Sequence, residues 1–399
     1  MSHVTSVSPA LGRVAGPLHD LLVVDFTRVL AGPFATMMLA DLGARVIKVE
    51  RPGSGDDTRT YGPFVDERSL YFARVNRGKE SIALSLKDPA DLEVARALVA
   101  SADVVVENFR PGVMARLGLG PEDLLAVNPK LVYCSISGFG HTGPWSARPA
   151  YDAVVQGMSG IMSITGSAEG PPVKPGSPVA DLSAGLYAFG GICAALRSGV
   201  GTHLDVAMYD ATVSLLEGAA LAWLATGQEP GRIGNAHFAI APFDTFTCSD
   251  RDITVCAAND LLFGALVTAL HLPGLLSDAR FRTNALRHDH RVALKAALED
   301  VLKGGTAEHW LDVLTEAGVP CGPISDVAEA VGSPQSQARN MVVDAGGLPV
   351  PGQPLKLSAW PDPPSRPAAP GLDEHGPAIR QEFIPDHGGE GVRDVRVET

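Results

Sequence analysis

A single acidic residue, Asp181, lies near the start of an almost uncharged stretch, SPVADLSAGLYAFGGICAAL, at residues 177–196. The residues after it are typical of a helix. Aspartate is a favoured N-cap, because its carboxylate accepts a hydrogen bond from a free amide of the first turn. A carboxylate at the start of a helix, with small neighbours that let a ligand approach, can also act as a nucleophile. Residue type and position therefore leave two interpretations, a helix cap or a covalent catalyst.

The composition indicates which class of protein positions this carboxylate. The chain has 399 residues, of which 45% are hydrophobic and 19% charged, which is typical of a globular protein of two or three domains. The net charge of -13 argues against a general nucleic-acid-binding protein. Five scattered cysteines, without metal-ligand spacing, indicate a reducing compartment. We find neither a signal-peptide pattern nor a membrane-spanning stretch and expect a cytoplasmic protein.

Strand and helix patterns alternate through the first half of the chain. The helical patterns include GPFATMMLADLG and DPADLEVARALVASA. This alternation predicts an α/β domain at 19–226, with a parallel sheet covered by helices on both faces. The turn after the first strand, DFTRVLAGPFA, has neither GxGxxG nor a P-loop, which argues against a nicotinamide or nucleoside triphosphate site. The predicted strands are LLVVDF (21–26), RVIKVE (45–50), SIALSL (81–86), DVVVEN (103–108) and LVYCSISGF (131–139).

The second half has a different pattern. A hairpin in PFDTFTCSDRDITVCAAND and helices in HRVALKAALEDVL and AEHWLDVLTEAG predict a smaller α+β domain at 227–330. Proline-rich sequence such as WPDPPSRPAAPG follows and predicts an extended strap. We therefore expect residues 331–376 to return to the large domain. Residues 1–18 are interpreted as an N-terminal extension and 377–399 as a tail that need not be ordered.

A series of motifs in one order, from about residue 19 to about 376, resembles the family III CoA-transferases of the CaiB/BaiF type. The resemblance implies a Rossmann-type, CoA-binding large domain, a small domain, and two chains interlaced into a homodimer. It implies transfer of coenzyme A from an acyl-CoA to a free carboxylic acid, with Asp181 as the catalytic aspartate. The motifs are VVDFTRVLAGPFATMMLADLGARVIKVERPGSGDDTR, YFARVNRGKESIALSLK, ADVVVENFRPGVMARLGLG, YCSISGFGHTGPW, AYDAVVQGMSG, PVADLSAGLYA, HLDVAMYDA, GNAHFAIAPF and AGVPCGP.

The implied chemistry explains why a carboxylate is needed. Asp181 would attack the donor thioester to give a mixed anhydride, and the released CoA thiolate would then form an aspartyl-CoA thioester. The acceptor acid would attack that thioester and leave as its own CoA ester. A helix N-terminus would favour the ionised nucleophile, and its free amides could support a developing oxyanion. Capping and catalysis are thus compatible.

The resemblance also implies where CoA binds. Motif positions place Arg51 and Arg116 near the phosphates, where fixed positive charge is needed. Without the family, both arginines could equally form surface ion pairs, and Phe109 could belong to the core. The residues placed around the adenine are Leu84, Asn108 and Phe109, and those along the turn near the thioester arm are Val29, Leu30, Ala31 and Gly32.

The nearest alternative is a 2-methylacyl-CoA racemase of the same superfamily. A racemase needs two acid/base groups beside the α-carbon of its substrate, and in that subfamily one is a histidine in the motif that reads AYDAV here. This chain has Tyr151 there, followed by Asp152, and a phenol is a poor base at neutral pH. We therefore expect both residues to line the CoA site or bond the backbone. His141, in the loop GFGHTGP, is a further candidate for substrate contact.

Other basic residues are candidates for a second carboxylate on the acid, which would need a cation or several amide donors. They are Arg148, Lys174 in PVKPGSP and His237 in GNAHF. Arg77 and Lys79, in NRGKES, are interpreted instead as a solvated basic turn.

The motifs containing LAGPFATMMLADLG and YDAVVQGMSG most resemble succinyl-CoA-dependent dicarboxylate CoA-transferases, so we expect succinyl-CoA as donor and a dicarboxylate as acceptor, with a monocarboxylic acid left open. Oxalate is not expected, because formyl-CoA:oxalate members have a glutamine where this chain has Leu30, and a glycine run that GRIGNAHFAIAP lacks. CoA would enter as a substrate, and no metal or redox cofactor is implied.

A third interpretation is a CoA-binding homologue without catalysis. Small residues near Asp181 argue against it, because they would leave room for a ligand. The expected partners are therefore the acyl-CoA and acid substrates and a second copy of the chain, with no nucleic acid and no membrane. The small residues are Gly176, Gly185, Gly190 and Gly191.

Overall fold

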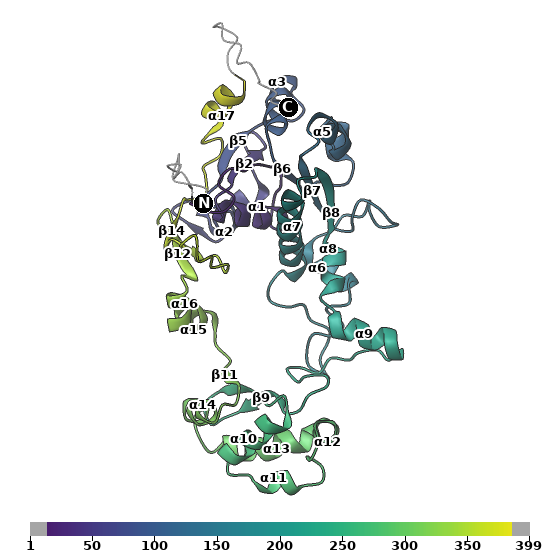
Figure 1. Ribbon diagram of the computed structural model, residues 1–399, viewed down its shortest axis with the longest axis vertical. Coiled ribbons are helices and arrows are strands. Elements are labelled where there is room, and N and C mark those ends of the chain that lie inside the picture. Colours follow the sequence, from purple (N-terminus) through teal and green to yellow (C-terminus); the bar gives the residue numbers. More distant parts are fainter. Residues whose placement is uncertain (1–13, 385–399) are drawn as a thin grey trace, which may run out of the picture. The chain divides into compact units, whose positions relative to one another are not determined.

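Six parallel strands form the main sheet of the computed structural model, which describes residues 14–384 (Figure 1). The strands lie in the order β5-β2-β1-β6-β7-β8. This is the winding of a Rossmann sheet, whose direction reverses between β1 and β6. The predicted α/β fold with a parallel sheet is confirmed. The strands are β1 (Leu22–Asp25), β2 (Arg45–Glu50), β5 (Glu80–Ala83), β6 (Val104–Glu107), β7 (Val132–Ser137) and β8 (Thr202–Ala207).

Helices cover both faces of this sheet, and successive side chains of each strand enter different cores. Val23 packs in one hydrophobic cluster and Val24 in the other, and Val104 and Val105 alternate in the same way. Helices contributing to the first cluster are α1 (Ala31–Asp41), α6 (Asp152–Met158), α7 (Val179–Ser198) and α8 (Met208–Ser214). Those contributing to the second are α3 (Pro89–Ala100), α4 (Val113–Arg116), α5 (Pro121–Val127) and α17 (Gly376–Phe383).

Helices α1 and α7 pack closely because a glycine stands at their contact. A Cβ atom on Gly185 would lie 2.8 Å from the carbonyl oxygen of Ala31 and 2.9 Å from the ring of Phe34. Gly185 therefore allows close packing of the helices rather than leaving room for a ligand, which corrects one of the glycine predictions. Nothing lies within 4 Å of a Cβ on Gly176 or Gly190, and Gly191 would only contact Leu204.

The remaining elements of this part of the molecule are short. Ser69 caps helix α2 by accepting a hydrogen bond from the amide of Phe72, at 3.1 Å. In the C-terminal segment, β12 pairs with β13 and with β14 in a small sheet. The short elements are η2 (Asp57–Thr60), β3 (Phe64–Val65), β4 (Arg68–Ser69), α2 (Leu70–Asn76), α16 (Pro334–Ala338), β12 (Val342–Ala345), β13 (Pro349–Pro351) and β14 (Ser365–Arg366).

A second group of elements forms a three-stranded antiparallel sheet, β11-β10-β9, with its own hydrophobic core. The predicted hairpin is confirmed as β9 and β10. Buried Arg287 donates to Asp260 at 2.6 Å and lies over the ring of Phe263. The elements are α9 (Glu217–Thr226), β9 (Phe243–Thr247), β10 (Asp252–Cys256), α10 (Asp260–Ala269), α11 (Gly274–Ser277), α12 (Asn284–Asp289), α13 (Arg291–Leu302), α14 (Ala307–Glu316), β11 (Cys321–Pro323) and α15 (Val327–Gly332).

The described chain thus divides into two compact units. The first contains residues 14–161, 175–217 and 334–384, and the second contains 162–174 and 218–333. The limits 19–226, 227–330 and 331–376 stay a prediction. Residues 1–13 of the predicted extension and 385–399 of the predicted tail lie outside the described residues, whereas the start of that tail belongs to helix α17.

Helix α7 is long and apolar enough to cross a membrane by length and composition alone, so the prediction that no stretch meets these criteria was wrong. The structure gives the apolar residues another role. One face of the helix, with Ala180, Ala184, Ala188 and Ile192, is fully buried in the core beside the sheet. Its spacing of four residues is that of a core helix.

Candidate active site

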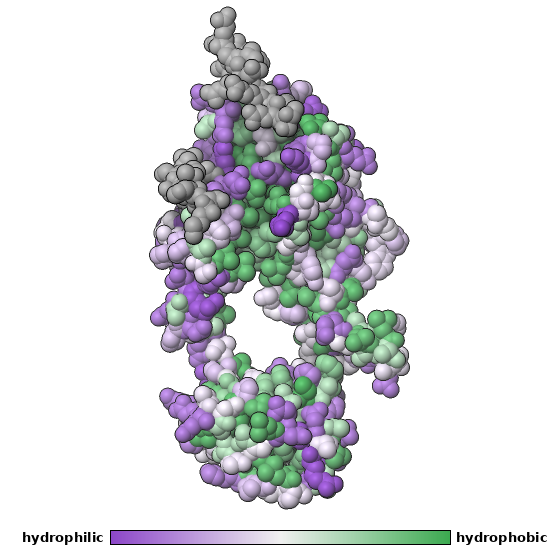
Figure 2. Space-filling view, in the orientation of Figure 1, coloured by the Kyte–Doolittle hydropathy of each residue, from purple (hydrophilic) through white to green (hydrophobic). Residues whose placement is uncertain are grey.

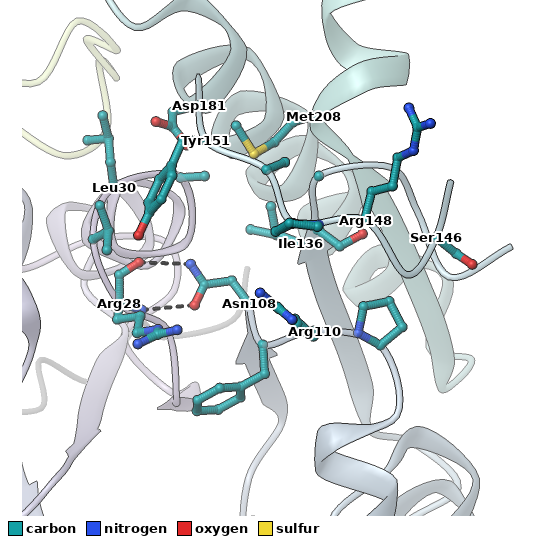
Figure 3. Close-up of a pocket in the computed structure, with 18 of the residues that line it drawn as sticks. Arg28, Leu30, Asn108, Arg110, Ile136, Ser146, Arg148, Tyr151, Asp181 and Met208 are labelled. Atoms are coloured by element: carbon teal, nitrogen blue, oxygen red, sulfur yellow. Dashed lines mark hydrogen bonds between the residues drawn. The ribbon is translucent and has the colours of Figure 1, made fainter. Parts of the chain in front are cut away.

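The candidate site lies at the carboxyl ends of β1 and β6, where the sheet reverses its winding. Asn108, directly after β6, accepts a hydrogen bond from the amide of Arg28 at 3.0 Å and donates one to its carbonyl oxygen at 2.8 Å (Figure 3). The side chain of Asn108 thereby joins the ends of the two strands. Ligands of open α/β sheets bind at such a reversal point.

A buried network of charges holds the turn after β1. Lys79 pairs with Asp25 at 3.0 Å, and Lys48 pairs with Asp56 at 3.0 Å. Burial opposes ionisation of Asp25, but the two lysines hold its pKa down at about 2. The carboxylate of Asp56 accepts from the amide of Val29, which has a φ of +69° that β-branched residues rarely adopt. Ion pairs thus maintain an unusual backbone in this turn.

The prediction that Arg77 and Lys79 form a solvated basic turn was wrong. Both side chains are buried, and Arg77 pairs with Asp41 at 2.6 Å. Their charges are compensated by acids on other elements, as buried charges must be. Lys79 supports the turn after β1 through Asp25, and Arg77 pairs with Asp41 at the end of α1. Neither residue lines the pocket that contains Asp181.

Asp181 lies in the first turn of α7, two residues after the first helical residue. The N-cap position is Pro178, which has no capping side chain, so Asp181 is not the cap. The capping acceptor comes from another helix: Asp152 accepts from the amides of Ala180 at 3.0 Å and Asp181 at 3.4 Å. The carboxylate of Asp181 is therefore left available for chemistry. The amides expected to support an oxyanion are already bonded to Asp152.

The environment of Asp181 opposes its ionisation. Burial and the neighbouring charge of Asp152 raise its pKa to about 7, while the charge of Arg74 lowers it. A carboxylate with this pKa is partly ionised at neutral pH and more basic than an exposed one. Partial desolvation is typical of a nucleophile in a closed site.

Asp181 lines a pocket of about 190 Å³. In Figure 3, Asp181 and Tyr151 lie toward one side of this pocket, and Arg148 and Ser146 toward the other. Arg148 packs against Trp145, with its guanidinium 5.3 Å from the ring centroid. The sequence-predicted residues that line the pocket are Val29, Leu30, Ala31, Asn108, Phe109, Arg148, Tyr151 and Asp181.

A second pocket, of about 630 Å³, lies beside the first, and Phe109 lines both. Apolar walls formed by Phe26, Val49 and Leu86 suit an adenine ring. Arg51 also approaches Asp57, at 3.5 Å, and is largely exposed. The sequence-predicted residues in this second pocket are Arg51, Leu84, Phe109 and Arg116.

Several basic residues that line the two pockets were not predicted from the sequence. Lys87 lines the second pocket with Arg51 and Arg116, and Arg28 and Arg110 line the first. Their positions in the sequence could have indicated them, because each lies within two residues of the end of a predicted strand. Basic residues at the carboxyl ends of parallel strands face the ligand edge of such a sheet.

Two other predicted residues, Gly32 and His141, line neither of these pockets. A Cβ on Gly32 would lie 2.3 Å from the side chain of Thr27, so this glycine serves the packing of the turn. The amide of His141 donates to Asp205 at 2.9 Å, and its Nε2 lies 3.9 Å from buried Glu107. Burial raises the pKa of Glu107 to about 7.

Two predicted acid-binding residues, Lys174 and His237, belong to the second unit. His237 lines a pocket within that unit and stacks on Phe238, with ring centroids 4.6 Å apart. Their contact with the acid stays a prediction. Among residues 14–384, no cluster of histidine, cysteine and acidic residues could hold a metal ion, and the five cysteines are free thiols.

Comparisons with known proteins agree on one family. The model of CoA-transferase family III matches residues 18–376. An acetyl-CoA:oxalate CoA-transferase of Acetobacter aceti is 52% identical over 385 residues, 95% of this chain and 98% of that protein. A succinyl-CoA:glutarate CoA-transferase of Homo sapiens is 41% identical over 378 residues, 92% of this chain and 86% of that protein. The crystal structure of a CAIB/BAIF family protein from Brucella suis matches with a TM-score of 0.82 and 44% identity, covering 92% of this chain and 100% of that one.

Proposed function

The chain belongs to CoA-transferase family III, and from this premise we propose that Asp181 is the nucleophile that carries CoA between two carboxylic acids. The observation that carries the proposal is the placement of Asp181. It is a half-buried carboxylate that caps nothing, and it lines a pocket at the reversal point of the sheet. An adjoining pocket offers apolar walls and cations suited to the nucleotide of CoA.

Each step of the proposed reaction exchanges one acyl bond for another. A carboxylate oxygen of Asp181 attacks the thioester carbon of the donor, the C–S bond breaks, and CoA leaves as the thiolate. The thiolate attacks the aspartyl carbonyl of the anhydride and releases the donor acid as its carboxylate. The acceptor carboxylate then attacks the carbonyl carbon of the aspartyl-CoA thioester, the C–S bond breaks, and a second anhydride joins Asp181 to the acceptor. The released thiolate attacks the acceptor acyl carbon of this anhydride, and the C–O bond to Asp181 breaks. The carboxylate of Asp181 is regenerated, and no net proton is consumed.

We propose that the nucleotide of CoA occupies the pocket with Arg51, Lys87 and Arg116, and that its thioester arm passes Phe109 to reach Asp181. Phosphate groups are bound most strongly by fixed cations, which these three residues supply. The racemase alternative gains no support, because Asp152 is engaged with the start of α7 and a phenol occupies position 151.

We propose a dicarboxylic acid as acceptor, with succinyl-CoA as donor. The 41% identity to a succinyl-CoA:glutarate CoA-transferase supports this pair. The 52% identity to an acetyl-CoA:oxalate CoA-transferase supports a second pair, acetyl-CoA and oxalate. Oxalate, which the sequence motifs did not lead us to expect, is therefore proposed as an acceptor as well. Both pairs share a dicarboxylate acceptor.

The proposed setting of the enzyme is a cytoplasmic homodimer. Helix α9 is apolar, yet none of its residues is buried within the described chain. An exposed apolar surface of this kind is typical of an interface. The five free thiols agree with a reducing compartment.

The experiment is a matrix of donors and acceptors read by mass spectrometry. Succinyl-CoA and acetyl-CoA are each incubated with oxalate, glutarate, mesaconate, malate and an aryl acid, using the wild type and Asp181→Asn. We expect new acyl-CoA products from the wild type alone. If the variant forms the same products, Asp181 is not the nucleophile. If a branched acyl-CoA instead exchanges its α-proton in deuterated water, the racemase alternative replaces the proposal.

A further inference from the structure

One carboxylate lies between arginines of the two neighbouring pockets. Oδ2 of Asp57 accepts a hydrogen bond from Nη1 of Arg28 at 3.1 Å, and its Oδ1 lies 3.5 Å from Nη2 of Arg51. Arg28 lines the pocket that contains Asp181, whereas Arg51 lines the larger pocket assigned to the nucleotide. The two oxygens of Asp57 therefore link a cation of one pocket to a cation of the other.

A buried network fixes the backbone that carries Asp57. The preceding residue, Asp56, pairs with Lys48 at 3.0 Å, and both of these side chains are fully buried. Asp56 also caps the short helical turn η2, because its carboxylate accepts a hydrogen bond from the amide of Thr58 at 2.9 Å. The amide of Asp56 donates to Glu50 at 3.0 Å. The carboxylate of Asp57 is therefore attached to a rigid turn.

The two arginines are held less firmly than this turn. The side chains of Arg28 and Arg51 are 48% and 61% exposed, and that of Asp57 is 39% exposed. Exposed ion pairs are weak, because water solvates both charges. Phosphate groups offer arginine several charged oxygens and bind it more strongly than a single solvated carboxylate does. A ligand with phosphate groups can therefore replace Asp57 as the partner of both arginines.

The covalent order of CoA places its pyrophosphate near these residues. The pyrophosphate joins the adenosine part to the pantetheine arm, which ends in the thiol. In the proposed binding mode, the adenosine part occupies the larger pocket, and the thioester arm passes Phe109 to reach Asp181. The pyrophosphate then lies where the two pockets adjoin, and there Asp57 contacts a cation of each pocket.

We propose that Asp57 holds the place of the CoA pyrophosphate between Arg28 and Arg51, and that the pyrophosphate displaces it from both arginines when CoA binds. The charge of Asp57 remains close to the phosphates, because its backbone is fixed. It therefore weakens the binding of CoA and favours release of the CoA ester that each turnover produces. The inference rests on the proposed function and identifies a positioning residue that sets the affinity for CoA.

The first test compares the affinities of the wild type and Asp57→Asn for CoA by isothermal titration calorimetry. Asparagine has nearly the same shape and no charge, so the variant should bind CoA about 3- to 10-fold more tightly. An unchanged or weaker affinity would overturn the inference.

Asp66→Asn is the matched control for this change of charge. Asp66 is an exposed acid of the same unit, 4.0 Å from Arg68, and lines neither of the two pockets. Its replacement should leave the Kd of CoA unchanged. An equal gain in both variants would show that the net charge of the protein, and not the position of Asp57, determines the affinity.

Shortened ligands show which part of CoA is affected. Dephospho-CoA keeps the pyrophosphate but lacks the phosphate on the ribose, and pantetheine lacks the whole nucleotide. Asp57→Asn should bind dephospho-CoA more tightly by the same factor as CoA, and its affinity for pantetheine should equal that of the wild type. A gain that requires the ribose phosphate, or one that extends to pantetheine, would contradict the placement of Asp57 at the pyrophosphate.

A variant that carries both Arg28→Gln and Arg51→Gln tests whether Asp57 acts through the arginines. In this background most of the gain from Asp57→Asn should disappear, because the acid has lost the cations for which it competes. A gain that persists in full would indicate long-range repulsion alone and would contradict the proposed displacement.

A separate measurement tests the proposed function. Wild-type protein incubated with the acyl-CoA donor alone should gain the mass of CoA at Asp181. Absence of this adduct and of all transfer products would contradict the proposed function itself. Presence of the adduct together with unchanged CoA affinity in Asp57→Asn would contradict only the inference about Asp57.

Discussion

In the proposed reaction, Asp181 must be ionised to attack a thioester, so activity should follow its titration. Burial and Asp152 raise its pKa to about 7, and kcat/KM should therefore increase as pH rises through this value. Asp152→Asn removes the neighbouring charge but keeps an oxygen that can accept from the amide of Ala180. We expect this variant to shift the acidic limb of the pH profile to lower pH. If the acidic limb of the pH profile does not move in this variant, a group other than Asp181 titrates in this range.

The raised pKa of Asp181 also means that its ionised carboxylate destabilises the native state. Its native pKa of about 7 lies above the unfolded value of 3.8, so the native state binds the proton more tightly. The contribution of this group to stability is therefore greatest below pH 4 and falls as pH rises toward 7.

Asp181→Asn should consequently be more stable than the wild type above pH 7, by about 1–4 kcal/mol, and the difference should shrink toward pH 4. Thermal or urea unfolding at pH 8 and pH 5 measures this. A variant less stable than the wild type at pH 8 would show that the carboxylate has a structural role. Higher stability with lost turnover is expected of a catalytic residue.

Single residues show where sequence reasoning reaches its limit. The motifs single out Asp181 as the candidate nucleophile. They cannot show that Asp152, 29 residues earlier, caps α7, the helix that carries Asp181. The partners of Arg77 and Lys79 are Asp41 and Asp25, which lie on other elements. A local pattern of basic residues therefore resembles a solvated turn, whereas the folded chain buries it.

At the scale of the element, the contact of α1 and α7 positions the proposed nucleophile, Asp181, relative to the pocket. Gly185→Ala would place a methyl group 2.8 Å from the carbonyl oxygen of Ala31 and force the helices apart. We expect a loss of about 1–3 kcal/mol in the free energy of unfolding and a lower kcat/KM.

Gly190→Ala, on the same helix with open space around its Cβ, is the control and should stabilise the protein by about 0.5–1 kcal/mol. Urea unfolding of both variants provides the comparison. Equal effects of the two substitutions would show that helix propensity, not the interhelical contact, determines the outcome.

The parallel sheet could be predicted because its strands are buried on both sides and alternate with helical periods. The turn after β1 could not be predicted in the same way. The positive φ of Val29 is maintained by Asp56, and Asp56 is held by Lys48. Such a conformation depends on three separate segments and leaves no local signal.

At the scale of the whole molecule, exposed apolar surface remains to be explained. Helix α9 exposes Leu221, Trp223 and Leu224 by 66%, 50% and 73%, and Figure 2 shows hydrophobic residues on its surface. In water such a helix is stabilised by burial against a partner. A second copy of the chain is the partner expected from the family resemblance.

We therefore expect a native mass near twice 41.6 kDa, and we expect Leu221→Asp with Leu224→Asp to shift the protein toward the monomer. Charged residues in the centre of an interface are costly because they lose hydration without gaining a partner. Val127→Asp is the control, because Val127 is as exposed but belongs to α5 in the first unit, whereas α9 begins at the boundary of the second unit and continues into it. Sedimentation velocity measures all three proteins. A monomeric wild type, or a dimer that persists in the double variant, would show that α9 does not form the interface, and its apolar face would then require a different partner.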